Sequence, residues 1–169
     1  YVDISAVGRG SLVAEPELIR FGDAPERARR LVGMGDTIIS TVRTYLRAVW
    51  PVNEPTDDLV VSTGFAVLTP RRVDPRYFSW WLRSDAFIEE VVARSVGVSY
   101  PAINALDLGD LPVRVPPPEE QRVIAEALDR FCTHSDLVGE RQQQSIDLLQ
   151  ERRGVLITAA VTGEFEVAV

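Results

Sequence analysis

The sequence of 169 residues contains no lysine, one cysteine and one histidine. All 18 basic residues are therefore arginines, which excludes a mechanism that needs a lysine, including the common acidic-plus-lysine nuclease centre. Cys132 alone excludes an internal disulfide and a cysteine-based metal cluster. His134 alone excludes the histidine pairs of zinc enzymes, and we interpret it as a surface or helix-packing residue.

Other absences concern membranes and catalysis. No run of 18 or more apolar residues occurs, so no membrane span is expected. The glycine-rich phosphate loops GxxxxGKS and GxGxxG are missing, as is the adenine-methylating sequence Asn-Pro-Pro-Tyr. The given residues show no charged segment followed by an apolar run, which is the pattern of a secretory signal. We therefore expect a cytoplasmic, non-catalytic protein that holds no metal and no cofactor of its own, and whose first segment precedes Tyr1.

Charge is distributed unevenly along the chain, whose formal net charge is −7. Residues 1–115 hold 13 Arg against 15 acidic residues, whereas residues 116–169 hold 5 Arg against 10. Residues 20–47 reverse the balance, with six Arg against three acids. Net acidity argues against strong non-specific binding to nucleic acid, but it leaves specific binding by one face open.

Short β-type segments dominate the first half. Alternating residues predict a strand at 1–8, and β-branched runs predict strands at 35–43 and 58–70. Between them, residues 23–32 suggest a short helix with Asp23 as its N-cap. Together these segments predict a small, curved antiparallel or mixed sheet.

A helix is expected after Asp74, because Asp-Pro is a good helix start and residues 76–96 place apolar side chains at three-to-four spacing. Trp80 and Trp81 in this segment are compatible with base stacking. Packing of the helix on the sheet is favoured, since large aromatics at helical spacing are usually buried.

The segment 116–162 predicts a long helix, with Pro118 at its entry and acidic residues in its first turn. Its coiled-coil frame is apolar at both ends and polar in the middle, and Gly139 leaves a break or kink open. Roughly 40 residues would span about 60 Å, too long to be covered by a small domain. We therefore expect a partner helix, packed against Ile124, Leu128, Phe131, Val138, Leu149 and Leu156.

A binding surface is suggested by the segment after the predicted strand at 35–43. Ser40, Thr41, Arg43, Thr44, Tyr45 and Arg47 interleave hydroxyls, arginines and an aromatic ring. This mixture suits a loop that contacts phosphates and base edges. It is equally typical of an amphipathic strand with arginines on its solvent-exposed face, and the residues alone leave both interpretations open.

Four stretches, in order, resemble the specificity subunit of type I restriction–modification enzymes. "GDTIISTVR" (35–43) and "STGFAVLTPR" (62–71) resemble two strands of its target-recognition domain. "GVSYPAINALDLGDLPVRVPPPEEQRVIAEALD" (97–129) resembles the loop, short helix, closing strand and spacer entry. "LLQERRGVLITAAVTGEFEV" (148–167) resembles the end of the spacer helix.

The resemblance implies a protein that does no chemistry and reads half of a split DNA target. Its spacer helix would dock modification subunits, which methylate adenine with S-adenosylmethionine, and a restriction subunit would join the larger complex. Such subunits carry two recognition domains and two spacers, whereas this chain shows one of each and no internal repeat. It is then a fragment, or a half-subunit that pairs with a second copy.

The implied architecture is α+β: a recognition domain at 1–115, a spacer helix at 116–162 and a tail at 163–169. Within it, residues 98–104 would end the domain near DNA, 111–115 would form a closing strand, and Pro116–Pro118 would launch the spacer. The candidate DNA-binding residues are Arg43, Thr44, Tyr45, Arg47, Ser99, Tyr100 and Asn104. For Asn104 the simple alternative is a helix cap. The competing function is a helix-mediated dimerisation or assembly module that does not read DNA.

Overall fold

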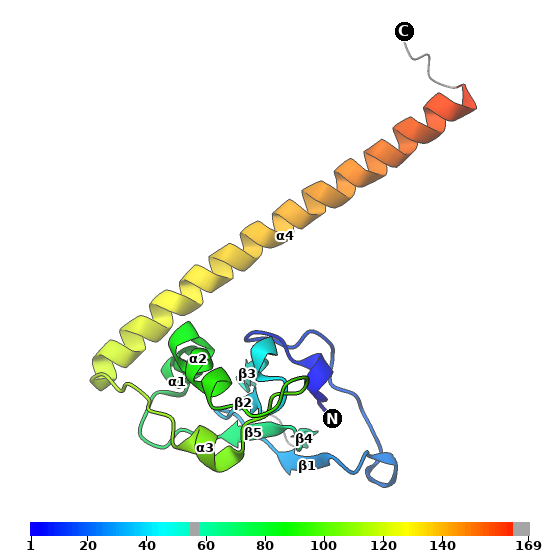
Figure 1. The fold of residues 1–169 in the computed structure, drawn as a ribbon. Helices are drawn as coiled ribbons and strands as arrows, with labels where there is room; N and C mark the ends of the chain where they lie inside the picture. Colours follow the sequence, from blue (N-terminus) through cyan, green and yellow to red (C-terminus); the bar gives the residue numbers. More distant parts are fainter. Residues whose placement is uncertain (55–57, 164–169) are drawn as a thin grey trace. The chain divides into compact units, whose positions relative to one another are not determined.

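The computed structural model describes residues 1–54 and 58–163 (Figure 1). The chain divides into two compact units, Tyr1–Ala125 and Glu126–Val169. The first unit is an α+β domain with small antiparallel sheets, which confirms the predicted fold class, and the described part of the second unit is helical as far as Thr162. The predicted tail at 163–169 lies outside the described residues apart from Gly163. Within the described ranges, none of the helices has the length and hydropathy needed to cross a membrane.

The described residues of the first unit form two small sheets. Strand β2 (Thr37–Ser40) lies between β3 (Val49–Pro51) and β5 (Phe65–Leu68), and both pairings are antiparallel. Strand β1 (Ala28–Leu31) pairs with β4 (Val60–Ser62) in a separate two-stranded sheet. Both β-branched runs thus form strands as predicted.

The second β-branched run divides at a turn, and its two halves join different sheets. Thr63 and Gly64 form this turn between β4 and β5. A Cβ on Gly64 would come within 2.2 Å of Ile4 Cδ1, so the turn packs closely against the N-terminal segment and a side chain there would have to displace Ile4. The run could not be resolved into two strands from β-propensity, because propensity does not specify which strand a segment pairs with.

Two predictions for the N-terminal region are wrong. Instead of a strand, residues 1–8 form a 3₁₀ turn at Ile4–Ala6, because the Asp3 carboxylate accepts a hydrogen bond from the Ser5 amide and stabilises a local turn. The helix expected at 23–32 is absent, and residues 28–31 form strand β1 instead. The backbone of β1 forms antiparallel hydrogen bonds with β4. Tertiary pairing here outweighs local helix propensity.

The helix predicted after Asp74 begins where expected but is two helices. Asp74 caps α1 (Pro75–Arg83) by accepting hydrogen bonds from two first-turn amides. Ser84 ends α1 with an extended backbone and caps α2 (Asp85–Ala93) through its hydroxyl. Trp81 packs against the buried core, as favoured, and Trp80 is half-buried beneath the Arg83 guanidinium.

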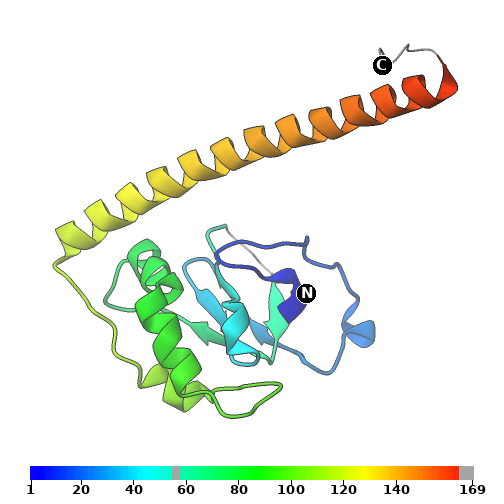
Figure 2. The same ribbon diagram turned by 45° about the horizontal axis from the view of Figure 1, so that its top comes forward.

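The core forms on both faces of the three-stranded sheet. Successive strand residues point to opposite faces, and Ile38 and Ile39 of β2 are both almost completely buried. Ile39 belongs to the cluster formed with α1, α2 and α3 (Ala105–Gly109), whereas Ile38 packs with the N-terminal segment and β4. The sheet is therefore the middle layer of the domain (Figure 2).

The connection to the last helix, at residues 111–117, forms no strand, so the closing strand predicted at 111–115 is wrong. It is instead fixed by side chains: Tyr77 Oη donates a 2.7 Å hydrogen bond to the Arg114 carbonyl, and Gln121 Nε2 donates one of 2.7 Å to the Pro116 carbonyl. Helix α4 (Pro118–Thr162) starts at the predicted proline with two acidic residues in its first turn. It continues through Gly139, so the break that the sequence left open does not occur.

Candidate nucleic-acid interface

Three segments meet where β2 ends and β5 begins. Ser40 pairs with Phe65, and the following Thr41 donates both its amide and its hydroxyl to the Gly64 carbonyl, at 2.8 and 2.9 Å. In the same β4–β5 turn, the Thr63 amide donates a 2.8 Å hydrogen bond to the Arg27 carbonyl, directly before β1. The 41–47 segment, the β4–β5 turn and the start of β1 are thus hydrogen-bonded to one another.

A fourth segment, the loop at 96–102, attaches to the same place. The Ile103 amide donates to the Thr41 carbonyl at 2.9 Å, and the Arg43 amide donates to the Pro101 carbonyl at 2.7 Å. Two reciprocal hydrogen bonds between Val96 and Ala102, of 2.8 and 2.9 Å, close the base of the loop. We call residues 27–30, 41–47, 63–64 and 96–103 together the loop end of the domain.

The loop end brings together two of the predicted DNA-binding residues. Arg43 has a φ of 51° and its guanidinium carbon lies 4.8 Å from the centre of the Tyr100 ring. A cation over an aromatic face at this distance is attracted by the ring, so each side chain restricts the other. Tyr100 nevertheless remains 65% exposed, which leaves its ring accessible to a ligand.

Thr44 has a supporting position rather than an exposed one. Its side chain is 3% exposed, and its hydroxyl lies 2.8 Å from the Ser95 hydroxyl. Ser95 in turn donates to the Val91 carbonyl at 2.7 Å, which connects this pair to α2. In this conformation Thr44 has almost no surface to offer to DNA, although it fixes the segment that carries Arg43.

Tyr45 and Arg47 differ in how available their side chains are to a ligand. Tyr45 is half exposed on the 3₁₀ helix Thr44–Leu46. Arg47, with a φ of 57°, forms an ion pair with Asp85 at the start of α2. Its charge is therefore already partly balanced, and Tyr45 presents the more accessible side chain.

Ser99 and Asn104 lie at the tip and at the end of the fourth segment. Ser99 is exposed in the loop. Asn104 Oδ1 accepts hydrogen bonds of 2.9 Å from the Leu106 and Asp107 amides and caps α3. The capping interpretation of Asn104 is confirmed, because its side-chain oxygen is occupied by the helix.

Val98 and Thr63 are exposed at the loop end but were not among the candidate DNA-binding residues, although Val98 lies in the 98–104 stretch that was expected near DNA. Val98 is completely exposed at the loop tip, and Thr63 is exposed in the β4–β5 turn. Gly97, with a φ of 115°, is the local signal for a tight loop, since this conformation is strained for other residues. Nothing in the sequence indicates that the 63–64 turn lies beside the 41–47 segment, because their contact is a long-range one.

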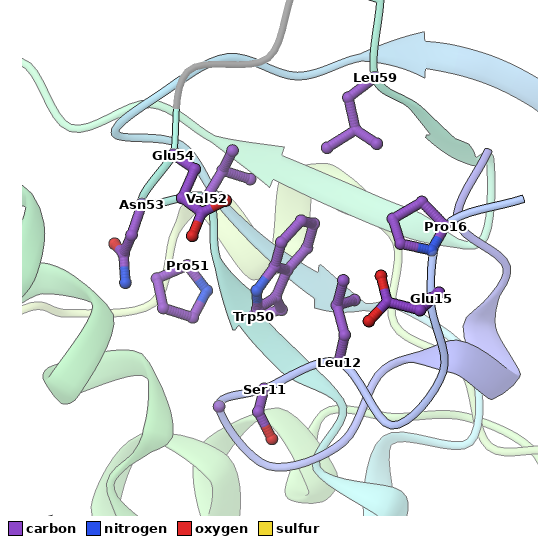
Figure 3. A pocket seen from close by; sticks show the side chains of 11 residues that line it. Ser11, Leu12, Glu15, Pro16, Trp50, Pro51, Val52, Asn53, Glu54 and Leu59 are labelled. Atoms are coloured by element: carbon purple, nitrogen blue, oxygen red, sulfur yellow. The ribbon is translucent and has the colours of Figure 1, made fainter. Parts of the chain in front are cut away.

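A separate cavity of about 390 Å³ lies against β3, between Trp50 and the N-terminal segment (Figure 3). Leu12, Trp50 and Leu59 give it apolar walls, whereas Glu15 and Glu54 add two carboxylates. Acidic side chains repel phosphates, so this cavity does not suit the backbone of a nucleic acid. Among residues 1–54 and 58–163, no group of three His, Cys, Asp or Glu side chains is arranged to hold a metal ion.

On helix α4, the residues predicted to pack against a partner helix differ in their exposure. Phe131 and Leu149 are 69% and 64% exposed, and Val138 and Leu156 are more than 40% exposed. Ile124 and Leu128 are half-buried. Large apolar side chains this exposed on one helix favour association with another surface.

These features define the class of protein. A family profile described as the type I restriction modification DNA specificity domain matches residues 33–147. The chain therefore belongs to this family, as its sequence stretches indicated. The match covers the loop end from Thr41 onward and most of helix α4.

Particular relatives agree with this assignment. The chain is 30% identical over 98 residues to the type I restriction enzyme EcoDI specificity subunit of Escherichia coli, covering 58% of this chain and 22% of that protein. It superposes on the HsdS subunit from Thermoanaerobacter tengcongensis with a TM-score of 0.73 and 30% identity. A second structure, from work on complex assembly and conformational transition of the type I R-M system, gives 0.74 and 29% identity. Both superpositions cover 98% of this chain and 43% of the other, so the chain spans less than half of either structure.

Proposed function

We propose that this chain is a specificity subunit, or part of one, of a type I restriction–modification system, and that it reads one half-site of a bipartite DNA target. The observation that carries the proposal is the assembly of four chain segments into one loop end that presents arginine, aromatic and hydroxyl side chains. Family membership supports it independently, since the matched domain is a DNA specificity domain.

The reading itself is assigned to the exposed side chains of the loop end. Arg43 and Tyr100 form a restricted pair, and restricted side chains lose less conformational entropy on binding. Tyr45, Arg47 and Ser99 flank this pair on the 41–47 and 96–102 segments. Thr44 and Asn104 act through position, because the hydroxyl of one and the amide of the other are occupied within the domain.

Docking of the modification subunits is assigned to α4. Its exposed apolar side chains supply the contact area, and residues 116–169 carry 10 acidic residues against 5 Arg. Excess acidity disfavours direct DNA contact by this segment and favours a protein partner. A second recognition-domain half, or a second copy of this chain, would occupy the same apolar stripe.

Catalysis is assigned to the partners. The chain itself would hold no cofactor, whereas S-adenosylmethionine would be bound by the modification subunit. A restriction subunit would join the larger complex for cleavage. The residues of this chain would then supply only recognition and spacing.

The test is a binding comparison at physiological salt. The chain, assembled with its modification subunit, should shift one bipartite duplex at a concentration at least 1,000-fold lower than a scrambled duplex, on the order seen for specific binding. Arg43→Ala should weaken binding to the target duplex by about 1–3 kcal/mol if Arg43 contacts a base. Equal affinity of the wild-type complex for both duplexes would contradict the proposal.

One observation favours a second candidate, an assembly module without DNA readout: the chain carries a net charge of −7. Light scattering of the chain with and without duplex DNA separates the two functions. A dimer that ignores every duplex, even beside the modification subunit, would support the assembly module.

A further inference from the structure

Strand β1 exposes two adjacent arginines on an edge of the domain. Arg29 and Arg30 are both exposed, and β1 pairs with β4 only along one side within the described residues. The pairing register shifts between Ala28 and Arg30, which places Arg29 in a β-bulge. Bulges re-aim side chains and are common beside functional sites.

Within the part of the chain that the structure describes, no acid balances the charges of these two arginines. Arg29 Nε donates a 2.6 Å hydrogen bond to the Glu26 carbonyl, which is neutral, and no acidic side chain of the described residues forms an ion pair with Arg29 or Arg30. Other arginines at the loop end are engaged: Arg27 pairs with Asp3 at 2.9 Å and Arg47 pairs with Asp85. Among the described residues, no acidic side chain pairs with Arg29, Arg30 or Arg43 in this region, and of these three only Arg43 is engaged with an aromatic ring.

Their position relative to the predicted reading loops is fixed by hydrogen bonds. The Arg27 carbonyl accepts from the Thr63 amide, and the neighbouring Gly64 carbonyl accepts from Thr41. At about 3.3 Å per residue, the two arginines lie within about 10 Å of the Thr63–Gly64 turn along β1. The major groove of DNA is about 12 Å wide, so a duplex with its groove against the 96–102 loop can place a phosphate strand beside β1.

We infer that Arg29 and Arg30 bind backbone phosphates of the DNA and position the duplex for the loops that read it. This inference rests on the proposed function and adds a division of labour within the domain. Guanidinium groups pair well with phosphate oxygens, and such contacts set register without carrying sequence information. The two arginines contribute affinity to every duplex equally, whereas Arg43 and the 96–102 loop contribute discrimination.

The experiment measures binding as a function of salt. The double variant Arg29→Gln/Arg30→Gln keeps most of each side-chain stem and removes two charges. In complex with the modification subunit, it should lower the slope of log affinity against log salt by about 2, since each phosphate contact contributes about 0.9. Target and scrambled duplexes should lose affinity by the same factor, so their affinity ratio should not change.

A matched control lies elsewhere on the same domain. Arg71 and Arg72 are also an exposed adjacent pair, and they follow β5 beyond its Leu68 end, where Leu68 pairs with Thr37 rather than Ser40. Arg71→Gln/Arg72→Gln makes the same change in net charge at the end of the strand opposite the loop end. Its salt slope should equal that of the wild-type complex.

The outcomes separate the inference from the proposed function. Wild-type discrimination together with an unchanged slope in the Arg29/Arg30 variant overturns the inference alone, as does an equal slope change in the control. A loss of affinity confined to the target duplex also overturns it, because the arginines would then read bases. A wild-type complex that does not distinguish the duplexes overturns the proposed function, and the inference falls with it.

Discussion

The 3₁₀ helix Thr44–Leu46 at the loop end lies between two arginines, Arg43 and Arg47. The backbone of each arginine has a left-handed conformation that residues other than glycine rarely adopt. Arg43 and Arg47 have φ values of 51° and 57°, in the left-handed region that costs an L residue about 1–2 kcal/mol. At Arg43 the surrounding contacts hold this conformation, through the Pro101 carbonyl and the Tyr100 ring. Backbone strain of this kind is often found where a loop has a function.

Substitution of Arg43 should therefore separate stability from binding. Arg43→Gly relieves the left-handed strain, whereas Arg43→Ala keeps it, so the glycine variant should be about 0.5–1 kcal/mol more stable than the alanine variant. Urea unfolding of both variants measures this difference. Both should lose target affinity equally, and a less stable glycine variant would contradict the strain argument.

A second residue-scale prediction concerns Asp3. Partial burial acts to raise the pKa of Asp3, but hydrogen bonds from Tyr1 Oη and Ser5 and the charge of Arg27 outweigh it, so the pKa lies below its ordinary value. A depressed carboxyl pKa contributes stability above the unfolded value, near 3.9, and that contribution is lost as pH falls through the folded value.

Asp3→Asn should accordingly lower the free energy of unfolding at pH 7, and the gap to wild type should shrink as pH falls below about 4. Urea unfolding at pH 7, 5 and 3 measures the gap. A gap independent of pH would show that the Asp3 charge contributes nothing.

At the scale of elements, helix α4 contains a glycine where another residue would serve better. Gly139 lies in the helix interior, and a Cβ built on it meets nothing within 4 Å. Gly97 differs. Its φ of 115° is strained for any residue with a Cβ, and a built Cβ would lie 3.1 Å from the Tyr100 carbonyl oxygen.

Gly139→Ala should stabilise α4 by about 1 kcal/mol, because alanine has the higher helix propensity. Circular dichroism at 222 nm during thermal unfolding follows the helix. Gly97→Ala is the contrasting variant and should lower the thermal midpoint. A lower midpoint for Gly139→Ala would indicate that the glycine is needed by a partner that packs closely on α4.

At the scale of the whole molecule, the second unit, Glu126–Val169, exposes apolar surface that a helix alone cannot bury. Leu149 and Leu156 are 64% and 47% exposed within the predicted stripe. Burying a leucine fully contributes about 1.5–3 kcal/mol, so two such residues matter for any helix–helix association.

Leu149→Glu/Leu156→Glu should weaken association with the modification subunit, or with a second copy, by tenfold or more. Sedimentation velocity over a concentration series measures the association. The control Gln144→Glu/Gln150→Glu adds the same two charges outside the predicted stripe and should leave association nearly unchanged. Equal weakening by both variants would mean that added charge, rather than apolar packing, controls assembly.

The sequence by itself determined the elements whose signals are local. Asp74–Pro75 marked the start of α1, the β-branched runs at 35–43 and 58–70 marked the segments that hold β2, β4 and β5, and Pro118 with its acidic neighbours marked the start of α4. Each of these depends on a cap, a propensity or a dipole within a few residues. Family membership was visible for a related reason, because its stretches are continuous in the chain.

Only the tertiary structure decided what depends on contacts between distant residues. Residues 28–31 form a strand because they pair with β4. Gly64 of the 63–64 turn accepts a hydrogen bond from Thr41, which lies 23 positions earlier in the sequence. Thr44 is buried rather than accessible, because Ser95, 51 positions away in the sequence, packs against its hydroxyl. Pairing and burial reward contacts only after the chain has closed long loops, so no local pattern records them.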